Sequence, residues 1–228
     1  MSKKLIGGVV AAAAAVVAIL VGVQVLGGDE TPTTASQFQD VPAVLALVKG
    51  IPQEGSVIGD PKAPVTITEF ADLQCSVCAA ASTGVVRELI TKYVRPGKAK
   101  MNLRLVRIFG PDSERGVFAG EAASLQGKGW TFAEIVLANQ GPEDGGWLTD
   151  GFAEAAASAG KLDVAQWKKD FAGQEVIQVY TRNTTAFQQS GGNGTPTFVV
   201  SGPGGSTRLS NAPLADFDVA IAKARGAN

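Results

Sequence analysis

The chain has 228 residues, of which 45% are hydrophobic and 18% charged, and its formal net charge is −1. This length is enough for one medium-sized core, and a charge near zero argues against nucleic acid as a main partner, because phosphate binding needs a basic surface. No histidine occurs, which excludes Ser-His-Asp and Cys-His catalysis and the common histidine-based metal sites. The only two cysteines are Cys75 and Cys78, so no disulfide framework holds the fold together.

A long uncharged apolar run follows two lysines at the N-terminus. From Leu5 to Leu26 a helix would reach about 33 Å, enough to cross a hydrocarbon core of about 30 Å. The lysines before the run and the acids after it favour a cytoplasmic N-terminus. We therefore expect residues 5–27 to be a transmembrane signal anchor after a cytoplasmic stub of residues 1–4, with a cleaved signal peptide as the alternative. Either way, most of the chain would be extracytoplasmic, in a periplasm or at the cell exterior.

Strand and helix patterns follow one another in a definite order after this leader. Residues 28–50 predict a polar tether and a short helix. β-Branched or alternating apolar residues predict strands at 56–58, 65–71, 101–108, 197–201 and 207–209. Apolar stripes at helical spacing predict helices at 42–49, 75–95, 113–126, 131–138, 150–159, 164–171, 175–188 and 214–224. Thr149 and Asp163 are predicted N-caps.

The order of these elements predicts an α/β fold with an insertion. A strand, a helix and a second strand form a βαβ unit, whose parallel strands need a right-handed crossover. A helical block then separates this unit from the last two strands and the closing helix. We therefore predict one α/β domain made of residues 51–109 and 193–228, with an all-helical insertion at residues 110–192.

The chemistry of the chain is expected at Cys75-Ser76-Val77-Cys78, where a predicted strand gives way to a helix. A thiol at a helix N-terminus meets unpaired backbone N–H groups and the positive end of the helix dipole, which favour its thiolate. The second thiol lies one turn along and can displace a mixed disulfide formed by the first. We therefore expect Cys75 to be the exposed nucleophile and Cys78 the buried resolving thiol, joined as a redox-active disulfide without another cofactor.

Three other interpretations of the cysteine pair are weaker. A zinc half-site would need two more ligands, and the chain has no histidine or further cysteine to supply them, so we expect no metal. A purely structural disulfide would close a loop of only a few residues and would stabilise the fold little. Two inert thiols are disfavoured because an exported compartment tends to oxidise such a pair.

Two further segments predict parts of the same site. Glu69 lies on the strand that leads to Cys75, and a buried acid there could carry protons for Cys78. The alternative is an ordinary strand-end carboxylate that faces solvent. Thr195-Pro196 precedes a late strand, where a proline is either an edge feature or a cis turn. The helical block is expected to cover the same edge of the sheet.

These residues closely resemble the DsbA-like branch of the thioredoxin superfamily. The resemblance extends from about residue 50 to residue 224 and is carried by Ala63–Asp72, Cys75–Cys78 and Gly194–Phe198, with familiar residues also at 121–123, 126–128, 130 and 146–149. It implies a thioredoxin fold with an inserted helical domain, and thiol–disulfide exchange with exported proteins. It also implies that Glu69 is the buried acid of the family. By the same resemblance, Thr195-Pro196 is a cis-proline loop that faces the disulfide and pairs with substrate backbone.

The chain departs from the strong oxidants of this family between the two cysteines, where it has Ser76-Val77 instead of Pro-His. Neither residue brings a positive charge. A helix terminus alone stabilises a thiolate by about 0.3–2 kcal/mol, which places the pKa of the first thiol roughly 0.2–1.5 units below its usual value of about 8.5. Because a stabilised thiolate makes a disulfide more oxidising, we expect a weaker oxidant than the Pro-His enzymes, with Ser76, Val77 and Glu69 tuning the two thiols.

The leading hypothesis is therefore a membrane-anchored enzyme that oxidises cysteine pairs in exported proteins. The resemblance implies that a quinone-linked membrane partner reoxidises it. Two alternatives remain open at this stage. A reductase or isomerase would use the same cysteines, and a redox-inert chaperone would use the same fold only to bind peptides.

Overall fold

The computed structural model describes residues 31–226. The stub at residues 1–4 and the predicted transmembrane segment at residues 5–27 lie outside this range. Within residues 31–226, no helix is long and apolar enough to cross a membrane.

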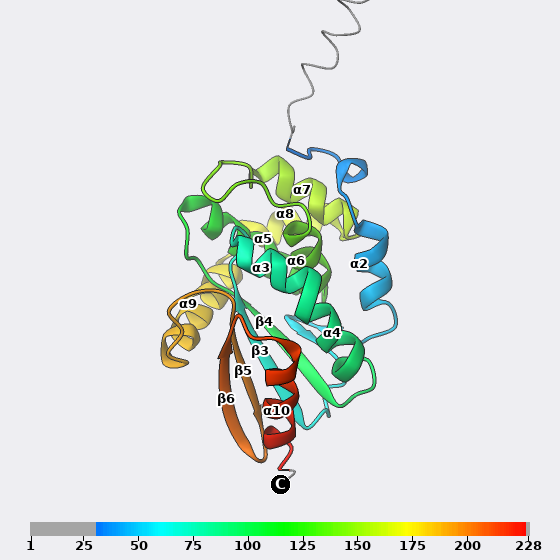
Figure 1. The fold of residues 1–228 in the computed structure, drawn as a ribbon. Coiled ribbons are helices and arrows are strands. Elements are labelled where there is room, and N and C mark those ends of the chain that lie inside the picture. The colour runs from blue at the N-terminus through cyan, green and yellow to red at the C-terminus, as the bar shows by residue number, and fades with distance from the viewer. Residues whose placement is uncertain (1–30, 227–228) are drawn as a thin grey trace, which may run out of the picture. The chain divides into compact units, whose positions relative to one another are not determined.

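A mixed six-stranded sheet with the order β1-β2-β4-β3-β5-β6 forms the centre of the fold (Figure 1). Its strands are β1 (Gln53–Glu54), β2 (Val57–Ile58), β3 (Val65–Ala71), β4 (Ala99–Leu105), β5 (Thr197–Gly202) and β6 (Gly205–Ser210). β3 pairs in parallel with β4 and antiparallel with β5, and β5 pairs antiparallel with β6. The predicted βαβ unit is therefore present, and the strand that leads to the cysteines lies between two others.

The helices follow the predicted order. Those outside the insertion are η1 (Ala35–Gln37), α2 (Val41–Val48), α3 (Ser76–Ala81), α4 (Arg87–Leu89) and α10 (Leu214–Ala224), with the π-helical segments η2 (Ser82–Val86) and η3 (Ile90–Val94). Those of the insertion are α5 (Pro111–Ser124), α6 (Gly129–Leu137), α7 (Asp150–Ala159), α8 (Val164–Phe171) and α9 (Gln174–Gln189). The all-helical insertion thus lies between β4 and β5.

One long kinked helix connects β3 to β4, because α3, η2, α4 and η3 follow each other without a break. Gly84 has non-helical dihedral angles, φ −106° and ψ −107°, inside the first π-helical segment, and such segments often bend helices at functional sites. The predicted apolar stripe on this helix is confirmed, since Val86, Leu89, Ile90 and Val94 are all buried.

The two faces of the sheet are covered by different helices. Successive residues of a strand point to opposite faces, so Glu69 and Phe70 of β3 face opposite sides. The ring of Phe70 lies 5.5 Å from that of Phe187 on α9. On the other side, α10 lies beside the long kinked helix, as Figure 1 also shows, because Lys92 and Tyr93 both bond to Asp218.

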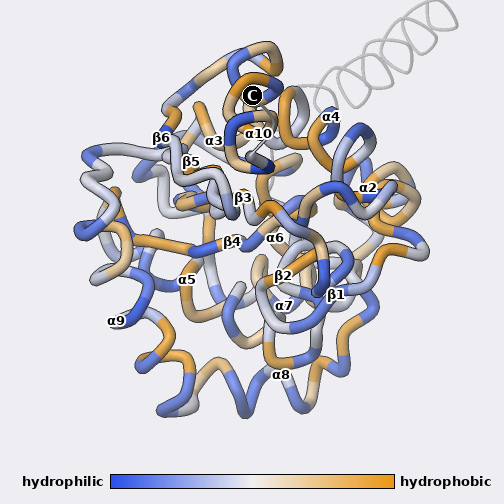
Figure 2. The backbone as a smooth tube through the Cα atoms, turned by 90° about the horizontal axis from the view of Figure 1, so that it is seen from below, coloured by the Kyte–Doolittle hydropathy of each residue, from blue (hydrophilic) through white to orange (hydrophobic). Residues whose placement is uncertain are grey.

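Aromatic side chains fill the core. The largest buried residues include Trp130, Phe132, Phe152, Phe198 and Phe217. The rings of Phe198 and Phe217 meet edge to face with centroids 5.0 Å apart, which fixes α10 to β5. Figure 2 shows that α8 and α9 alternate hydrophilic and hydrophobic residues along their length, as helices with one buried side do.

Both predicted N-caps of the insertion are confirmed. The hydroxyl of Thr149 accepts a hydrogen bond from Phe152 N at 3.1 Å, and the carboxylate of Asp163 accepts one from Gln166 N at 3.0 Å. One predicted strand is shifted. It was expected to run from residue 101 to residue 108, whereas β4 runs from Ala99 to Leu105.

Candidate active site

The turn after β3 places the first cysteine at the start of the long kinked helix. Cys75 is the N-cap residue of α3, with extended backbone angles of φ −71° and ψ 117°. Asp72 shapes this turn, because its carboxylate accepts hydrogen bonds from Gln74 N at 2.9 Å and from Ile108 N at 2.7 Å. Cys75 N donates to the backbone oxygen of Asp72 at 3.0 Å. Asp72 was not singled out in the sequence. An aspartate whose carboxylate accepts a hydrogen bond from the backbone N–H two residues later is nevertheless typical of turns.

Asp72 also explains why β4 ends early. Its second carboxylate oxygen accepts hydrogen bonds from both Ile108 N and Phe109 N. These amides are therefore not free to extend the strand beside β3, and the predicted end at residue 108 is wrong for this reason.

The two thiols are close together and both are free in this structure. Cys78 is buried as expected, but Cys75 is only 4% exposed. The expectation of an exposed Cys75 is therefore wrong. The Cys75 thiol lies against the loop before β5, where it donates a hydrogen bond to the backbone oxygen of Thr195 at 3.3 Å.

The environments of the two thiols drive their pKa values apart. A hydrogen bond from the Cys78 thiol is the largest influence on Cys75, and together with contacts to Thr195 and to the backbone of Cys78 and Val77 it outweighs burial and lowers the pKa of Cys75 to about 6. Burial raises the pKa of Cys78 well above its ordinary value. The pKa of Cys75 is thus lower than a helix terminus alone would give, because the second thiol contributes as well.

Ser76 and Val77 act mainly through their backbone. Val77 N–H is one of the groups that lower the pKa of Cys75, while its side chain is 39% exposed beside the thiols. Ser76 N instead donates to the carboxylate of Glu143 at 2.8 Å. The structure therefore brings a negative charge from the insertion next to the cysteine pair.

The Thr195-Pro196 peptide bond is cis, and its loop lies against Cys75. Pro196 is followed directly by β5, whose Thr197 hydroxyl donates to Gly194 O at 2.7 Å. The Thr195 hydroxyl is buried, and Thr195 is among the residues whose hydrogen bonds lower the pKa of Cys75. The loop thus places polar groups of Thr195 beside the Cys75 sulfur.

Glu69 is buried, with 2% of its surface exposed, so the alternative of a solvent-facing carboxylate is wrong. Burial, and then the charge of Glu134, raise the pKa of Glu69 to about 8. Glu134 lies on α6 and accepts a hydrogen bond from the Ser82 hydroxyl at 2.9 Å. The charge of Glu69 is among the influences that raise the pKa of Cys78, so the acid on β3 lies near the buried thiol, and Glu134 of the insertion lies near Glu69.

The insertion also holds the turn that carries Cys75. Gln140 donates hydrogen bonds to the backbone oxygens of Leu73 at 2.7 Å and of Cys75 at 3.1 Å. Asp144 N donates to the side-chain oxygen of Gln74 at 3.1 Å. These residues were missed in the sequence, because nothing in the pattern around them indicates contact with a turn about 70 residues earlier.

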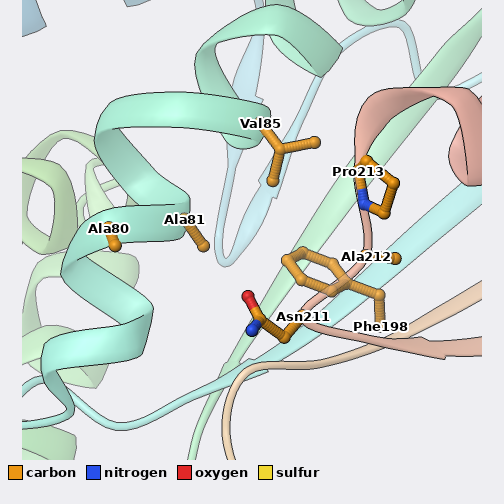
Figure 3. Close-up of a pocket in the computed structure, with 7 residues that line it drawn as sticks. All are labelled: Ala80, Ala81, Val85, Phe198, Asn211, Ala212 and Pro213. Carbon is orange, nitrogen blue, oxygen red and sulfur yellow. The ribbon is translucent and has the colours of Figure 1, made fainter.

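A small apolar pocket lies beside the cysteine helix. It has a volume of about 350 Å³ and is lined by Ala80, Ala81, Val85, Phe198, Asn211, Ala212 and Pro213. Figure 3 shows the three helix residues on one side of the pocket and the residues of the loop before α10 on the other, with Phe198 between them. No cluster of His, Cys, Asp or Glu residues within residues 31–226 could hold a metal ion.

Comparisons with known proteins identify the family of the chain. A family model described as thioredoxin matches residues 52–213. A probable disulfide bond formation protein D from Bacillus cereus is 28% identical over 149 residues, which cover 64% of this chain and 69% of the relative.

Two solved structures share the fold. Oxidised BdbD from Bacillus subtilis has a TM-score of 0.66 at 22% identity, covering 77% of this chain and 96% of that protein. A thioredoxin-like oxidoreductase from Silicibacter pomeroyi has a TM-score of 0.62 at 26% identity, and the match covers 83% of this chain and 99% of that protein. With the cysteine pair at the start of the helix after β3, these matches show that the chain belongs to the thioredoxin family, as a DsbA-like thiol:disulfide oxidoreductase.

Proposed function

We propose that the protein oxidises cysteine pairs in exported proteins through a disulfide between Cys75 and Cys78. The observation that carries this proposal is the placement of Cys75 at the start of α3, against the cis Thr195-Pro196 loop, with Cys78 buried one turn further along. In keeping with this placement, the pKa of Cys75 is lowered to about 6 and that of Cys78 is raised. At neutral pH the reduced enzyme then holds one thiolate and one thiol. This asymmetry favours the reduced form and so makes the disulfide oxidising.

The first step is attack of a substrate thiolate on the sulfur of Cys75 in the oxidised enzyme. A substrate–Cys75 disulfide forms, the Cys75–Cys78 bond breaks, and its electron pair goes to Cys78. Because Cys78 is buried and its pKa is raised, it takes up a proton. Glu69, whose pKa of about 8 keeps it protonated at neutral pH, is the proposed source of that proton.

The second step releases the substrate in its oxidised form. A second substrate thiolate attacks the substrate sulfur of the mixed disulfide, and Cys75 leaves with the electron pair. A thiol with a pKa of about 6 is a good leaving group at neutral pH. Two electrons have then passed from the substrate to the enzyme, which ends with a Cys75 thiolate and a Cys78 thiol.

Substrate is proposed to bind along the loop of Thr195 and Pro196. The Thr195 backbone oxygen lies 3.3 Å from the Cys75 sulfur, so an extended substrate that pairs with this loop would place its own cysteine next to Cys75. The pocket beside Phe198 offers apolar surface for a neighbouring substrate side chain. Exposed Val77 adds further apolar surface beside the thiols.

The proposed setting is outside the cytoplasm. The apolar run at residues 5–27 supports a membrane anchor, and the resemblance supports reoxidation by a quinone-linked membrane partner. Oxidised partner would accept two electrons and restore the Cys75–Cys78 disulfide. An anchored enzyme would remain close to such a partner in the same membrane.

The test is a redox titration of the full chain in detergent. The protein is equilibrated in glutathione buffers of graded potential and then alkylated. The number of alkylated thiols is counted by mass spectrometry. We expect a reversible two-thiol transition near or above about −200 mV, the range of the oxidising members of the superfamily. A transition near −270 mV would indicate a thioredoxin-like reductant. Absence of a two-thiol transition, together with peptide binding retained in Cys75→Ala, would support the chaperone alternative and refute the proposal.

A further inference from the structure

A carboxylate from the insertion lies at the residue between the two cysteines. Glu143 belongs to the connection between α6 and α7, and its side chain is exposed. Its Oε1 accepts a hydrogen bond from Ser76 N at 2.8 Å. Hydrogen bonds from the backbone and then the side chain of Ser76 lower the pKa of Glu143, so the group is ionised at neutral pH.

The carboxylate of Glu143 is bonded to the amide of the residue that follows Cys75. The amides of Val77 and Cys78 stabilise the Cys75 thiolate, whereas the amide of Ser76 is already occupied by Glu143. Two negative charges near each other disfavour one another's ionised forms. None of the ion pairs among residues 31–226 includes Glu143, so no cation in that range neutralises it through a salt bridge.

The loop holds Glu143 in place through its neighbours. Gln140, three residues earlier, bonds to the backbone of Cys75, and Asp144 N bonds to Gln74. Both contacts connect the same loop to the turn before α3. These hydrogen bonds between the insertion and the thioredoxin fold therefore fix the position of Glu143 beside Ser76.

We infer that Glu143 is a positioning residue that restrains the oxidising power of the enzyme, because its carboxylate opposes the Cys75 thiolate of the reduced form. This inference rests on Cys75 being the reacting thiol, as proposed above. Glu143 would affect the equilibrium in which two molecules of reduced glutathione reduce the enzyme disulfide. The products are the enzyme dithiol and one molecule of glutathione disulfide. Two electrons pass to the enzyme, and the proton of Cys75 goes to solvent when the thiolate forms. A less stable thiolate shifts this equilibrium toward the enzyme disulfide.

The experiment compares the full-length wild type with Glu143→Gln and Asp144→Asn. Glutamine keeps an oxygen that can accept from Ser76 N but removes the charge. Asp144→Asn removes a charge from the same exposed loop without touching Ser76, and is the matched control. Two quantities are measured for each protein, the pH at which alkylation of Cys75 is half-maximal and the equilibrium with glutathione.

We expect Glu143→Gln to lower the half-maximal pH of Cys75 alkylation. One solvent-exposed charge bonded to the residue next to Cys75 should change the stability of the thiolate about two- to fivefold. The glutathione equilibrium should move toward reduced enzyme by the same factor, which is about 9–21 mV at 29.6 mV per tenfold change. At 1 M NaCl, where the screening length falls to about 3 Å, the difference from wild type should shrink.

Three outcomes would count against the inference. If the wild type shows a reversible two-thiol transition and Glu143→Gln has the same alkylation pH and glutathione equilibrium, the role of Glu143 is refuted and the proposed function stands. An equal shift in Asp144→Asn also refutes the role of Glu143, because any loop charge would then have the same effect. A wild type without a reversible two-thiol transition refutes the proposed function itself, and with it this inference.

Discussion

A Glu69→Gln substitution tests the buried acid on β3 through the pH dependence of stability. Burial, and then the charge of Glu134, raise the pKa of Glu69 from 4.5 to about 8. An unfolded chain ionises this group near pH 4.5, whereas the folded protein keeps it protonated up to about pH 8. The stability that the protonated group contributes is therefore complete below pH 4.5 and is lost as the pH rises toward 8.

The size of this loss follows from the two pKa values. Each pH unit between them costs about 1.36 kcal/mol of unfolding free energy. Between pH 4.5 and pH 7 the wild type should therefore lose on the order of 3 kcal/mol through Glu69. Glutamine is neutral throughout, so Glu69→Gln should not show this part of the loss. Relative to wild type, the variant should become more stable by about that amount as the pH rises.

The assay is urea unfolding of the reduced full chain between pH 4.5 and pH 8, with a phosphine reductant to keep both thiols free. Wild type, Glu69→Gln and Glu88→Gln are compared at each pH. Glu88 lies on α4 and is exposed, so Glu88→Gln controls for the loss of a carboxylate from the neighbouring helix. The informative quantity is how the difference in unfolding free energy between variant and wild type changes with pH. A difference that is the same at every pH also contains the effect of altered hydrogen bonding.

A difference between Glu69→Gln and wild type that stays constant from pH 4.5 to pH 8 would refute the reasoning. Glu69 would then ionise like a solvent-exposed acid, despite its 2% exposure. It would be a carboxylate at neutral pH and could not supply the proton that Cys78 takes up. The proposed proton transfer would have to be abandoned, whereas the disulfide exchange itself would stand.

Three further predictions concern single contacts. Cys78→Ala removes the strongest influence on Cys75, so the pKa of Cys75 should rise above about 6 in pH-dependent alkylation, and an unchanged value would contradict that hydrogen bond. A Cβ at Gly120 would overlap the end of the buried Leu105 side chain, so Gly120→Val should lower the unfolding free energy measured in urea by about 1–3 kcal/mol. A neutral result would mean that the Leu105 side chain or α5 can move to make room. Thr149→Ala should cost about 1 kcal/mol because α7 loses its N-cap, while Thr149→Ser should not.

The predicted site residues that the structure brings together share a local signal. Cys75 and Cys78 are three positions apart, where a β-branched run changes to helical spacing, and both features are visible within a few residues. Pro196 is recognisable because a proline that enters a strand is restricted to a few structural settings, such as a sheet edge or a cis turn. Placing these three residues in one fold depends only on the order of strands and helices.

The residues that the sequence misses are held by contacts between distant segments. Gln140 and Glu143 lie in a loop without periodicity, yet they bond to the turn and helix around Cys75. The same holds for Glu134, which looks like one of many helical glutamates until α6 packs beside Ser82. The exposure of Cys75 was misjudged for a related reason, because the loop of Thr195 covers it and is separated from it by 120 residues.

The insertion therefore contributes to the chemistry as well as covering the sheet. Gln140 fixes the backbone of Cys75, Glu143 sets a charge at Ser76, and Glu134 raises the pKa of Glu69. Each acts on a different stage of the proposed reaction, namely the position of the nucleophile, the stability of its thiolate and the supply of a proton to Cys78. Since none of these groups lies between the cysteines, the sequence of the C-x-x-C motif alone cannot determine the redox potential of this oxidoreductase.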